Sequence, residues 1–229
     1  MISIVIPVLN EAKTIEKLLN HLVDCADLKN ISEIIVVDGG STDGTKNIIQ
    51  NLELRVKLLT SEKGRAKQMN IGAKNSKGSI LYFLHADSFP PPNYAHYIIE
   101  EIKKGNNAGC FRLQFDNKHW WLRLASWLTK FRWRACRGGD QSQFITKTLF
   151  EDIGGFDESY TIYEDNILIN ELYKRKEFVV INKKNKTSAR LYKRHGIWTV
   201  QYHFWTIYVK RWFGASADEL YAYYKKYLN

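Results

Sequence analysis

Short apolar runs alternate with amphipathic segments along the first part of the chain. Mostly apolar residues make up Ile2–Pro7, Ile34–Val37, Val56–Leu59 and Ile80–Leu84, runs whose length and composition are typical of strands. After the first run, apolar residues recur at helical spacing at Ile15, Leu18, Leu19, Leu22, Val23 and Ala26, with Asn10 as the predicted N-cap. Further helices are expected through Ile48 and over Ala66–Asn75. Strands that alternate with helices predict right-handed βαβ units and a mostly parallel sheet.

The alternation stops at Pro90–Pro92, and a less regular half follows. The sequence predicts a helix over Tyr94–Lys104, a strand over Gly109–Phe115, a helical stretch over Trp120–Trp133 and a last helix over Ala217–Tyr227. No linker separates two independent units. We therefore expect one α/β domain over residues 1–196, with a C-terminal helical extension over residues 197–229 packed on it.

Composition and charge narrow the function classes. The chain has 229 residues, 45% of them hydrophobic, and a formal net charge of +10 whose excess lies largely after residue 110. A basic surface favours nucleic acid, anionic lipid headgroups or phosphorylated substrates. Three cysteines without C-x-x-C spacing argue against a disulfide framework or a zinc site. Without a signal peptide or an apolar run of about 20 residues, the expected location is cytoplasmic, with peripheral contact on the inner face of the membrane.

Two acidic turns follow predicted strands and indicate the class of substrate that the protein binds. Asp38 ends the second strand, and Asp87 follows the fourth. Carboxylates at this position lie at the edge of the sheet where open α/β folds bind ligands. Asp38 could accept a hydrogen bond from a base, whereas Asp43 in the same turn is interpreted as an N-cap or turn residue. The pair indicates a nucleotide-diphosphate substrate.

Other polar residues near these turns complete a candidate donor site. The segment containing Pro7, Asn10 and Glu11 leaves the first strand and could form a wall of the nucleotide pocket, or simply a capped helix start. Arg65 and Gln68 lie at the beginning of a helix, where phosphates are favoured.

Asp87 is the candidate metal ligand. Mg²⁺ or Mn²⁺ needs oxygen ligands, and one carboxylate can suffice when waters and substrate phosphates complete the coordination shell. His85, two residues earlier, is a second candidate for the metal or the phosphates, or a buried imidazole with other partners.

Two later acidic turns supply candidates for the acceptor or phosphate side. These are Asp140 with Gln141, and Glu164 with Asp165. Apolar residues follow Glu164–Asp165 at helical spacing, so one acid could simply favour the helix dipole. Asp165 is the candidate general base, because aromatic neighbours and an adjacent acid are expected to raise its pKa.

Taken in order, these motifs resemble those of family-two glycosyltransferases with the GT-A fold. The resemblance rests on Pro7–Glu11, Asp38–Thr45, Gly64–Ala73, His85–Asp87, Gly154–Phe156 and Glu164–Asp165. Within that family, the chain resembles the radical-SAM/selenodomain-associated transferases, to which the Gly138–Gln141 and Arg194–Gly196 segments are also similar. The match extends from residue 1 to about residue 200.

The resemblance implies an inverting sugar transfer from a nucleotide diphosphate sugar, most simply a UDP-sugar, to an acceptor hydroxyl. It implies that Asp38 and Glu11 bind the nucleotide, that Asp87 holds the metal and that Asp165 deprotonates the acceptor. Arg194 would lie on the acceptor or phosphate side, and the acceptor could be lipid-linked. The chain departs from the family at His85, where a D-x-D motif usually has Asp, so metal binding would depend on Asp87.

Three other functions agree with part of the sequence. A nucleotidyltransferase would need a Gly/Arg-rich phosphate loop directly after the first strand, and Pro7–Glu11 is not one. A nucleic-acid-binding module fits the charge but has no binding motif, and the acidic sheet edge would repel phosphates, so no nucleic-acid partner is expected. A sugar-nucleotide-binding protein without turnover stays open. The aromatic, basic stretches Trp120–Arg137 and Trp198–Trp212 could form an acceptor side against a membrane or pack as a core.

Overall fold

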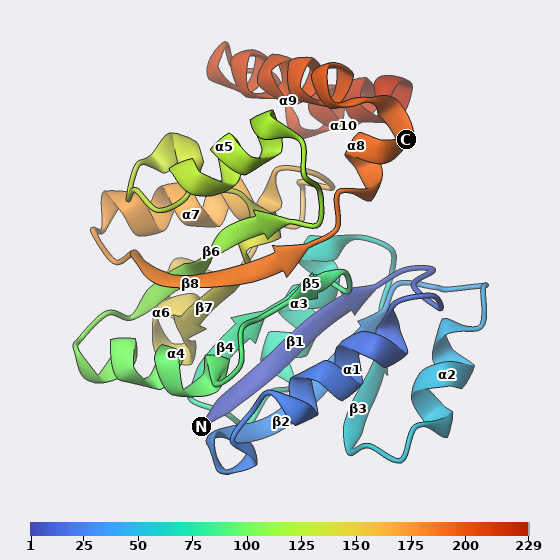
Figure 1. Ribbon diagram of the computed structural model, residues 1–229, viewed down its shortest axis with the longest axis vertical. Coiled ribbons are helices and arrows are strands. Elements are labelled where there is room, and N and C mark those ends of the chain that lie inside the picture. Colours follow the sequence, from blue (N-terminus) through green and yellow to red (C-terminus); the bar gives the residue numbers. More distant parts are fainter. Residues whose placement is uncertain (229) are drawn as a thin grey trace.

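An eight-stranded mixed sheet organises the chain (Figure 1). This computed structural model describes residues 1–228. The strand order is β3-β2-β1-β4-β7-β6-β8-β5. The strands are β1 (Ile2–Val8), β2 (Ile31–Asp38), β3 (Val56–Thr60), β4 (Ile80–Phe83), β5 (Ser88–Phe89), β6 (Ala108–Phe115), β7 (Gln143–Thr146) and β8 (Val179–Thr187). Strands β1 to β4 pair in parallel, which confirms the predicted βαβ half.

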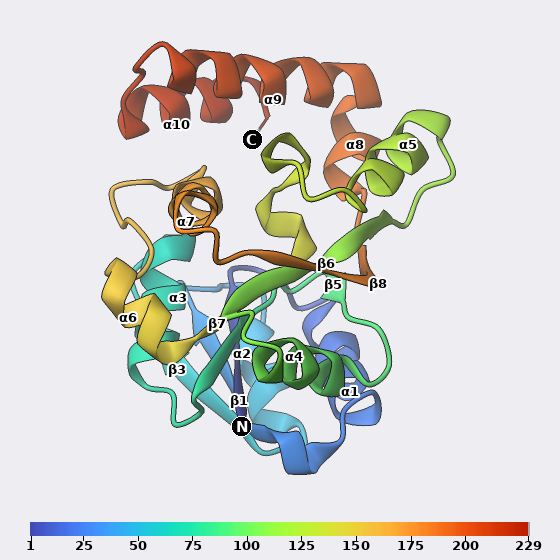
Figure 2. The same ribbon diagram turned by 90° about the vertical axis from the view of Figure 1, so that its left-hand side faces the viewer.

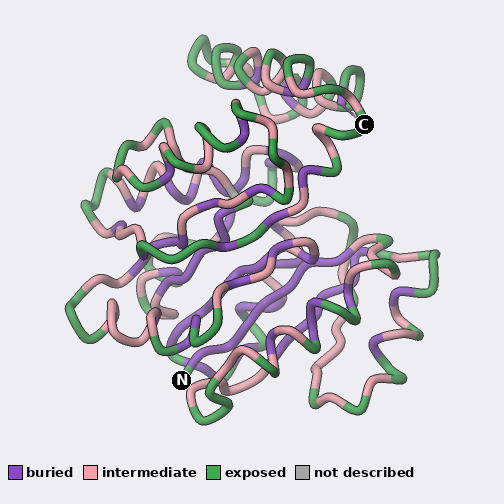
Figure 3. Tube along the Cα trace, viewed as in Figure 1, coloured by how far each residue is buried: buried purple, intermediate pink, exposed green. Residues whose placement is uncertain are grey.

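Six helices cover the two faces of this sheet. The helices of the chain are α1 (Ile15–Asp24), α2 (Thr45–Asn51), α3 (Arg65–Lys74), α4 (Tyr94–Lys103), α5 (Trp120–Leu128), α6 (Lys147–Ile153), α7 (Glu164–Lys174), α8 (Arg190–His195), α9 (Ile197–Trp212) and α10 (Ala217–Tyr227), with 3₁₀ turns η1 (Leu28–Asn30), η2 (Arg134–Cys136) and η3 (Gly139–Gln141). Helices α1, α2 and α4 share one core cluster, and α3, α6 and α7 share another. The central strands are therefore buried on both sides, as their continuous apolar sequences indicate (Figure 3).

Alternate residues of β1 serve the two cores. Ile4 and Ile6 belong to the α1 side, whereas Val5 belongs to the α3 side. Helix α3 lies close to the sheet at Gly72, where an added Cβ would overlap the side chain of Val5. The close packing of α3 fixes the position of its N-terminus at the edge of the sheet.

The C-terminal helices form an outer layer, far from the N-terminus (Figures 1 and 2). Helices α9 and α10 pack against each other and against the loop before α7, through a cluster that includes Tyr160, Ile162, Ile207 and Leu220. The division between residues 1–196 and the extension stays a prediction, and Asn229 lies outside the described residues.

Two local predictions are wrong. Asn10 does not cap α1, which begins at Ile15; instead Asn10 adopts φ 57° and its side chain accepts a hydrogen bond from the Thr42 N–H. The helix predicted over Trp120–Trp133 ends at Leu128. The chain turns there because the Thr129 hydroxyl bonds the Ser126 carbonyl and accepts from Leu113 N–H of β6.

The second half contains strands that the sequence pattern did not reveal. Strand β7 is antiparallel to both β4 and β6, and β8 is parallel to β6. Strand β8 exposes Lys183, Lys184 and Lys186 and buries the polar Asn185 and Thr187, so it lacks the mostly apolar sequence of the central strands.

Candidate active site

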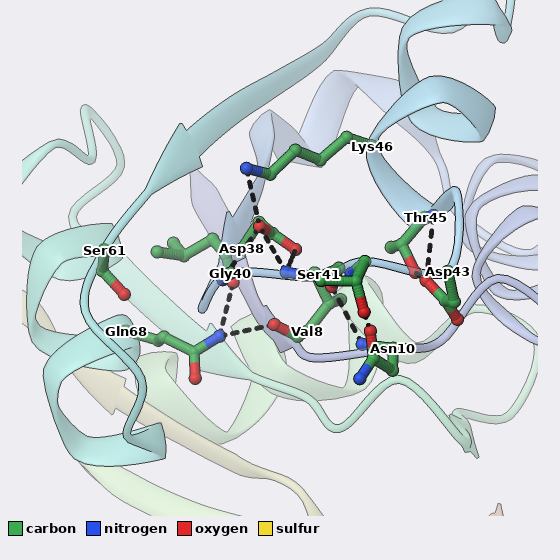
Figure 4. Close-up of polar contacts among 12 residues, drawn as sticks. Val8, Asn10, Asp38, Gly40, Ser41, Asp43, Thr45, Lys46, Ser61 and Gln68 are labelled. Carbon is green, nitrogen blue, oxygen red and sulfur yellow. Dashed lines mark hydrogen bonds and ion pairs between the residues drawn. The ribbon is translucent and has the colours of Figure 1, made fainter.

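Asp38 is fixed by its own turn at the carboxyl end of β2 (Figure 4). Its fully buried carboxylate accepts hydrogen bonds from the backbone N–H groups of Gly40 and Ser41, each at 3.0 Å, and the Lys46 ammonium lies 3.2 Å away. Burial opposes the charged form, but these contacts outweigh it and lower the pKa of Asp38. The structure therefore provides an ionised carboxylate at the edge of the sheet.

The loops after β1 and β2 are joined by reciprocal hydrogen bonds. Asn10 N–H donates to Ser41 Oγ, and Thr42 N–H donates to Asn10 Oδ1, both at 2.9 Å. Asp43 accepts from the N–H groups of Ala12 and Thr45, so it is a turn residue, as interpreted from the sequence. These bonds hold the Asn10 and Asp38 loops as one wall.

The Gln68 side chain stabilises this wall through hydrogen bonds to the two strands that precede the loops (Figure 4). Its buried side-chain amide donates to the carbonyl oxygens of Val8, at 2.8 Å, and Val37, at 2.7 Å. Both N–H donors are thus used to hold the ends of β1 and β2 together. Pro7, the other donor-site candidate of this region, is a buried residue of β1 that pairs with Val37.

Arg190 connects two of the candidate carboxylates. Its Nη1 donates to Glu11 Oε2 at 2.9 Å and its Nη2 to Glu11 Oε1 at 2.5 Å, while its Nε lies 3.2 Å from Asp87 Oδ2. Burial raises the pKa of Asp87, although the Arg190 charge opposes this effect. The structure thus brings Glu11 and Asp87 together, as the sequence predicted, and adds a guanidinium that it did not.

Arg190 had no signal in the sequence beyond its place in a basic stretch. The resemblance indicated Arg194, which lies one turn later on α8 and is exposed. Arg190 reaches the site because α8 directly follows β8, and Ser188 N–H at the end of that strand bonds the Asp87 carbonyl.

His85 lies between two acids. Its Nδ1 is 3.7 Å from Asp140 Oδ1, and its Nε2 is 3.9 Å from Asp165 Oδ2. Burial disfavours the imidazolium, but Asp140 and Asp165 outweigh it and raise the pKa of His85. Because His85 belongs to the same turn as Asp87, this contact shows that the candidate base Asp165, on α7, lies close to that turn.

Glu164 and Arg65 form a neighbouring ion pair. Glu164 is buried, Arg65 Nε lies 3.0 Å from its Oε1, and neither carboxylate oxygen has a partner with hydrogen-bond geometry among the described residues. Burial raises the pKa of Glu164 to about 7, in spite of the nearby Arg65 charge. Arg65 is partly exposed and faces Glu164, Asp165 and Asp140, so its charge is available at the same edge.

The side chain of Asp140 is exposed, whereas that of the neighbouring Gln141 is buried. The protein around the Asp140 carboxylate partly shields it from water and opposes its charge, but the contact with His85 outweighs this effect and lowers its pKa. The Gln141 side chain is buried, accepts from Arg137 Nη1 at 2.6 Å and donates to the Cys136 carbonyl at 2.6 Å. Gln141 thus supports the turn that presents Asp140.

The donor set around Asp87 suits a hard cation only in part. Among residues 1–228, no group of three or more His, Cys, Asp or Glu side chains is arranged to hold a metal ion. Asp87 supplies one carboxylate, and His85 is engaged by two acids. Mg²⁺ is commonly held by one or two carboxylates together with substrate phosphates, so these residues fit a cation that arrives with a diphosphate.

The comparisons with known proteins agree with this geometry. The family model described as glycosyl transferase family 2 matches residues 3–157. Glycosyltransferase AglE of Haloferax volcanii is 38% identical over 94 residues, which are 39% of this chain and 31% of that protein. Dolichol-phosphate mannosyltransferase of Pyrococcus furiosus is 33% identical over 110 residues, which are 46% of this chain and 31% of the relative. The chain thus spans about a third of the length of these two relatives.

A solved structure shows the same fold. The mannosyltransferase PcManGT from Pyrobaculum calidifontis, in complex with GDP-Man and Mn²⁺, matches with a TM-score of 0.67 at 19% identity, over 90% of this chain and 59% of that one. The mixed sheet flanked by helices is therefore the GT-A arrangement predicted from the sequence. With the family model matched over most of its length, the chain belongs to glycosyl transferase family 2.

Proposed function

We propose that this protein transfers a sugar from a nucleotide diphosphate sugar to an acceptor hydroxyl, with inversion at the sugar carbon. The observation that supports the proposal most is the meeting of acids from distant segments at one sheet edge. Asp38, Glu11 and Asp87 follow β2, β1 and β4, and His85 lies 3.9 Å from Asp165 on α7. Open α/β sheets bind their ligands at this edge.

The donor would lie along the wall made by the Asn10 and Asp38 loops. Asp38 would accept from the base and Glu11 from a ribose hydroxyl, once Arg190 is released from Glu11. Arg190 would then neutralise the diphosphate together with Arg65, whose guanidinium is partly exposed beside Glu164. The UDP preference stays a prediction, since PcManGT was solved with GDP-Man.

Asp87 would hold Mg²⁺ or Mn²⁺ together with the diphosphate oxygens. When bound, the cation supplies Lewis-acid stabilisation of the leaving diphosphate. His85 would remain in contact with Asp140 and Asp165.

Asp165 would act as the general base. The acceptor oxygen forms a bond to the sugar carbon, the bond from that carbon to the diphosphate oxygen breaks, and the acceptor proton passes to the Asp165 carboxylate. The nucleoside diphosphate leaves with the electron pair of the broken bond. A positioned base typically contributes about 10²–10⁴-fold to the rate.

The acceptor would be lipid-linked. A relative named as a dolichol-phosphate mannosyltransferase supports this class, as do undecaprenyl-phosphate transferases 27% identical over 128 residues or more. Peripheral membrane contact and a cytoplasmic location accompany this proposal. Within the family, the chain would belong with the radical-SAM/selenodomain-associated transferases, which its Gly138–Gln141 and Arg194–Gly196 segments also resemble.

A thermal-shift screen tests donor binding. UDP, GDP, dTDP and CMP would each be added with and without Mn²⁺, and stabilisation by at least one nucleoside diphosphate is expected. Asp87→Ala should remove the metal dependence of that shift. No shift with any nucleoside diphosphate would contradict the donor site.

A product assay tests turnover. Transfer releases a nucleoside diphosphate, whereas a nucleotidyltransferase would release or consume pyrophosphate and a binding protein would release neither. Asp165→Asn should retain the donor-induced thermal shift and lose transfer. If this variant still transfers sugar, the base lies elsewhere.

A further inference from the structure

Helix α9 presents an aromatic stripe that the rest of the chain leaves uncovered. Its exposed residues Trp198, Tyr202, Trp205, Val209 and Trp212 recur at spacings of four and three, which places them on one side of the helix. The buried Val200 and Ile207 lie away from this stripe. Helix α9 thus has one apolar side toward the protein and a second toward the surface.

Helix α5 extends the stripe. Trp120, Leu124 and Trp127 are exposed at the same helical spacing. The ring centroid of Trp198 lies 5.9 Å from that of Trp120 and 5.4 Å from that of Trp121. The two helices therefore form one continuous surface, which we call the α5–α9 face; Phe213, just after α9, adjoins it.

The two stretches that carry this face expose basic side chains. Residues 117–139 contribute the exposed Lys118, Arg123, Lys130 and Arg132, and residues 188–217 contribute the exposed Lys193, Arg194 and Lys210. Neither stretch contains Asp or Glu. Trp and Tyr favour the interface between lipid and water, and Lys and Arg favour anionic headgroups.

We propose that the α5–α9 face docks on the surface of an anionic lipid bilayer. Within residues 1–228, no helix is both long and apolar enough to cross a membrane. An α9 of 16 residues, about 24 Å long, would instead lie in the interface with its aromatic stripe inserted. This choice of partner follows from the mixture of indole rings and basic groups, because a second copy of the same basic face would be repelled.

The docked face adjoins the candidate base. The Tyr208 ring of α9 lies 5.3 Å from the Tyr163 ring, and its hydroxyl lies 3.5 Å from Asn166 Oδ1, on the two sides of Glu164–Asp165. A lipid-linked acceptor held in the bilayer would thus reach the site from the α9 side. This orientation rests on the proposed transferase function, whereas membrane binding itself does not.

Vesicle flotation tests the docking. The protein, without nucleotide, should float with vesicles of phosphatidylcholine and phosphatidylglycerol (3:1), float less at 0.5 M salt and remain unbound with pure phosphatidylcholine. Trp212→Gln/Phe213→Gln changes two side chains that are 85% and 84% exposed, so folding should be retained. We expect this variant to lose at least about tenfold in vesicle binding.

Two controls separate the outcomes. Leu28→Gln removes an exposed apolar side chain far from the α5–α9 face and should bind as the wild type does. The UDP or GDP thermal shift should be equal in all variants, so failure of the donor site is visible separately. Absence of flotation with anionic vesicles at low salt would overturn the proposal, as would a stable dimer in sedimentation that the Trp212→Gln/Phe213→Gln variant abolishes.

Discussion

Arg190 forms a two-pronged ion pair with Glu11, a residue 179 positions earlier in the chain. The same guanidinium contacts Asp87. One cation therefore lies against both the carboxylate predicted for the ribose and the carboxylate predicted for the metal. The pair also connects the start of the sheet to α8, and through it to the C-terminal helices.

Arg190→Ala should weaken metal-free binding of UDP or GDP about tenfold, because a cation beside the diphosphate is lost. Mn²⁺ should restore part of the loss, since Asp87 is no longer paired. Isothermal titration with and without Mn²⁺ measures both effects. Arg194→Ala, one turn later on α8, is the matched comparison and should change affinity less. Equal losses of affinity in the two variants would contradict a phosphate contact made by Arg190 alone and would support the phosphate role that the resemblance implied for Arg194.

Asp38→Asn should destabilise the protein by about 1.5–3 kcal/mol at pH 7, because a buried charged acceptor loses its partners. The folded-state pKa of Asp38 is lowered. Its contribution is therefore complete above its unfolded value of 3.8 and is lost as pH falls below it. The difference in the free energy of unfolding between variant and wild type, measured with urea, should be smaller at pH 3 than at pH 7. The exposed Asp218→Asn is the control.

Glu164→Gln should flatten the pH dependence of stability between about pH 4.5 and 7. The folded-state pKa of Glu164 is raised from 4.5 to about 7, so its stabilising effect is complete below 4.5 and is lost as pH rises toward 7. The shift corresponds to roughly 3 kcal/mol at most. Urea unfolding across this range checks it, with the exposed Glu53→Gln as control. If the free energy of unfolding of Glu164→Gln changes with pH as steeply as that of the wild type, the raised pKa of Glu164 is contradicted.

His85→Asp should lower the melting temperature in the absence of metal, because it places a carboxylate beside Asp140 and Asp165. A cost of about 1 kcal/mol would shift the melting temperature by about 2–4 °C in a chain of this size. Mn²⁺ should stabilise this variant more than the wild type, since a second carboxylate then lies near Asp87.

His85→Gln provides the neutral comparison for that experiment. It removes the imidazole without adding an acid, so it should gain no extra stabilisation from Mn²⁺. If His85→Asp has the same melting temperature as the wild type and Mn²⁺ raises both melting temperatures equally, residue 85 does not face the cation.

The sequence by itself determined the first half of the sheet and the acids at its edge. The apolar runs Ile2–Pro7, Ile34–Val37 and Ile80–Leu84 define three central parallel strands because residues buried on both faces are mostly apolar, and the run Val56–Leu59 defines the edge strand β3. Asp38, Glu11 and Asp87 follow those strands directly, so local order along the chain was enough to place them at one edge. The GT-A arrangement followed from the same motifs.

Only the tertiary structure decided which distant residues complete the site. Strand β8 is rich in exposed lysines, and its pairing with β6 and β5, rather than its own pattern, sets where α8 begins and hence where Arg190 lies. His85 lies between Asp140 and Asp165 because η3 and α7 are folded back over the sheet edge. The aromatic stretches have helical spacing whether they are covered or exposed, so only packing could decide that Trp198, Trp205 and Trp212 face outward.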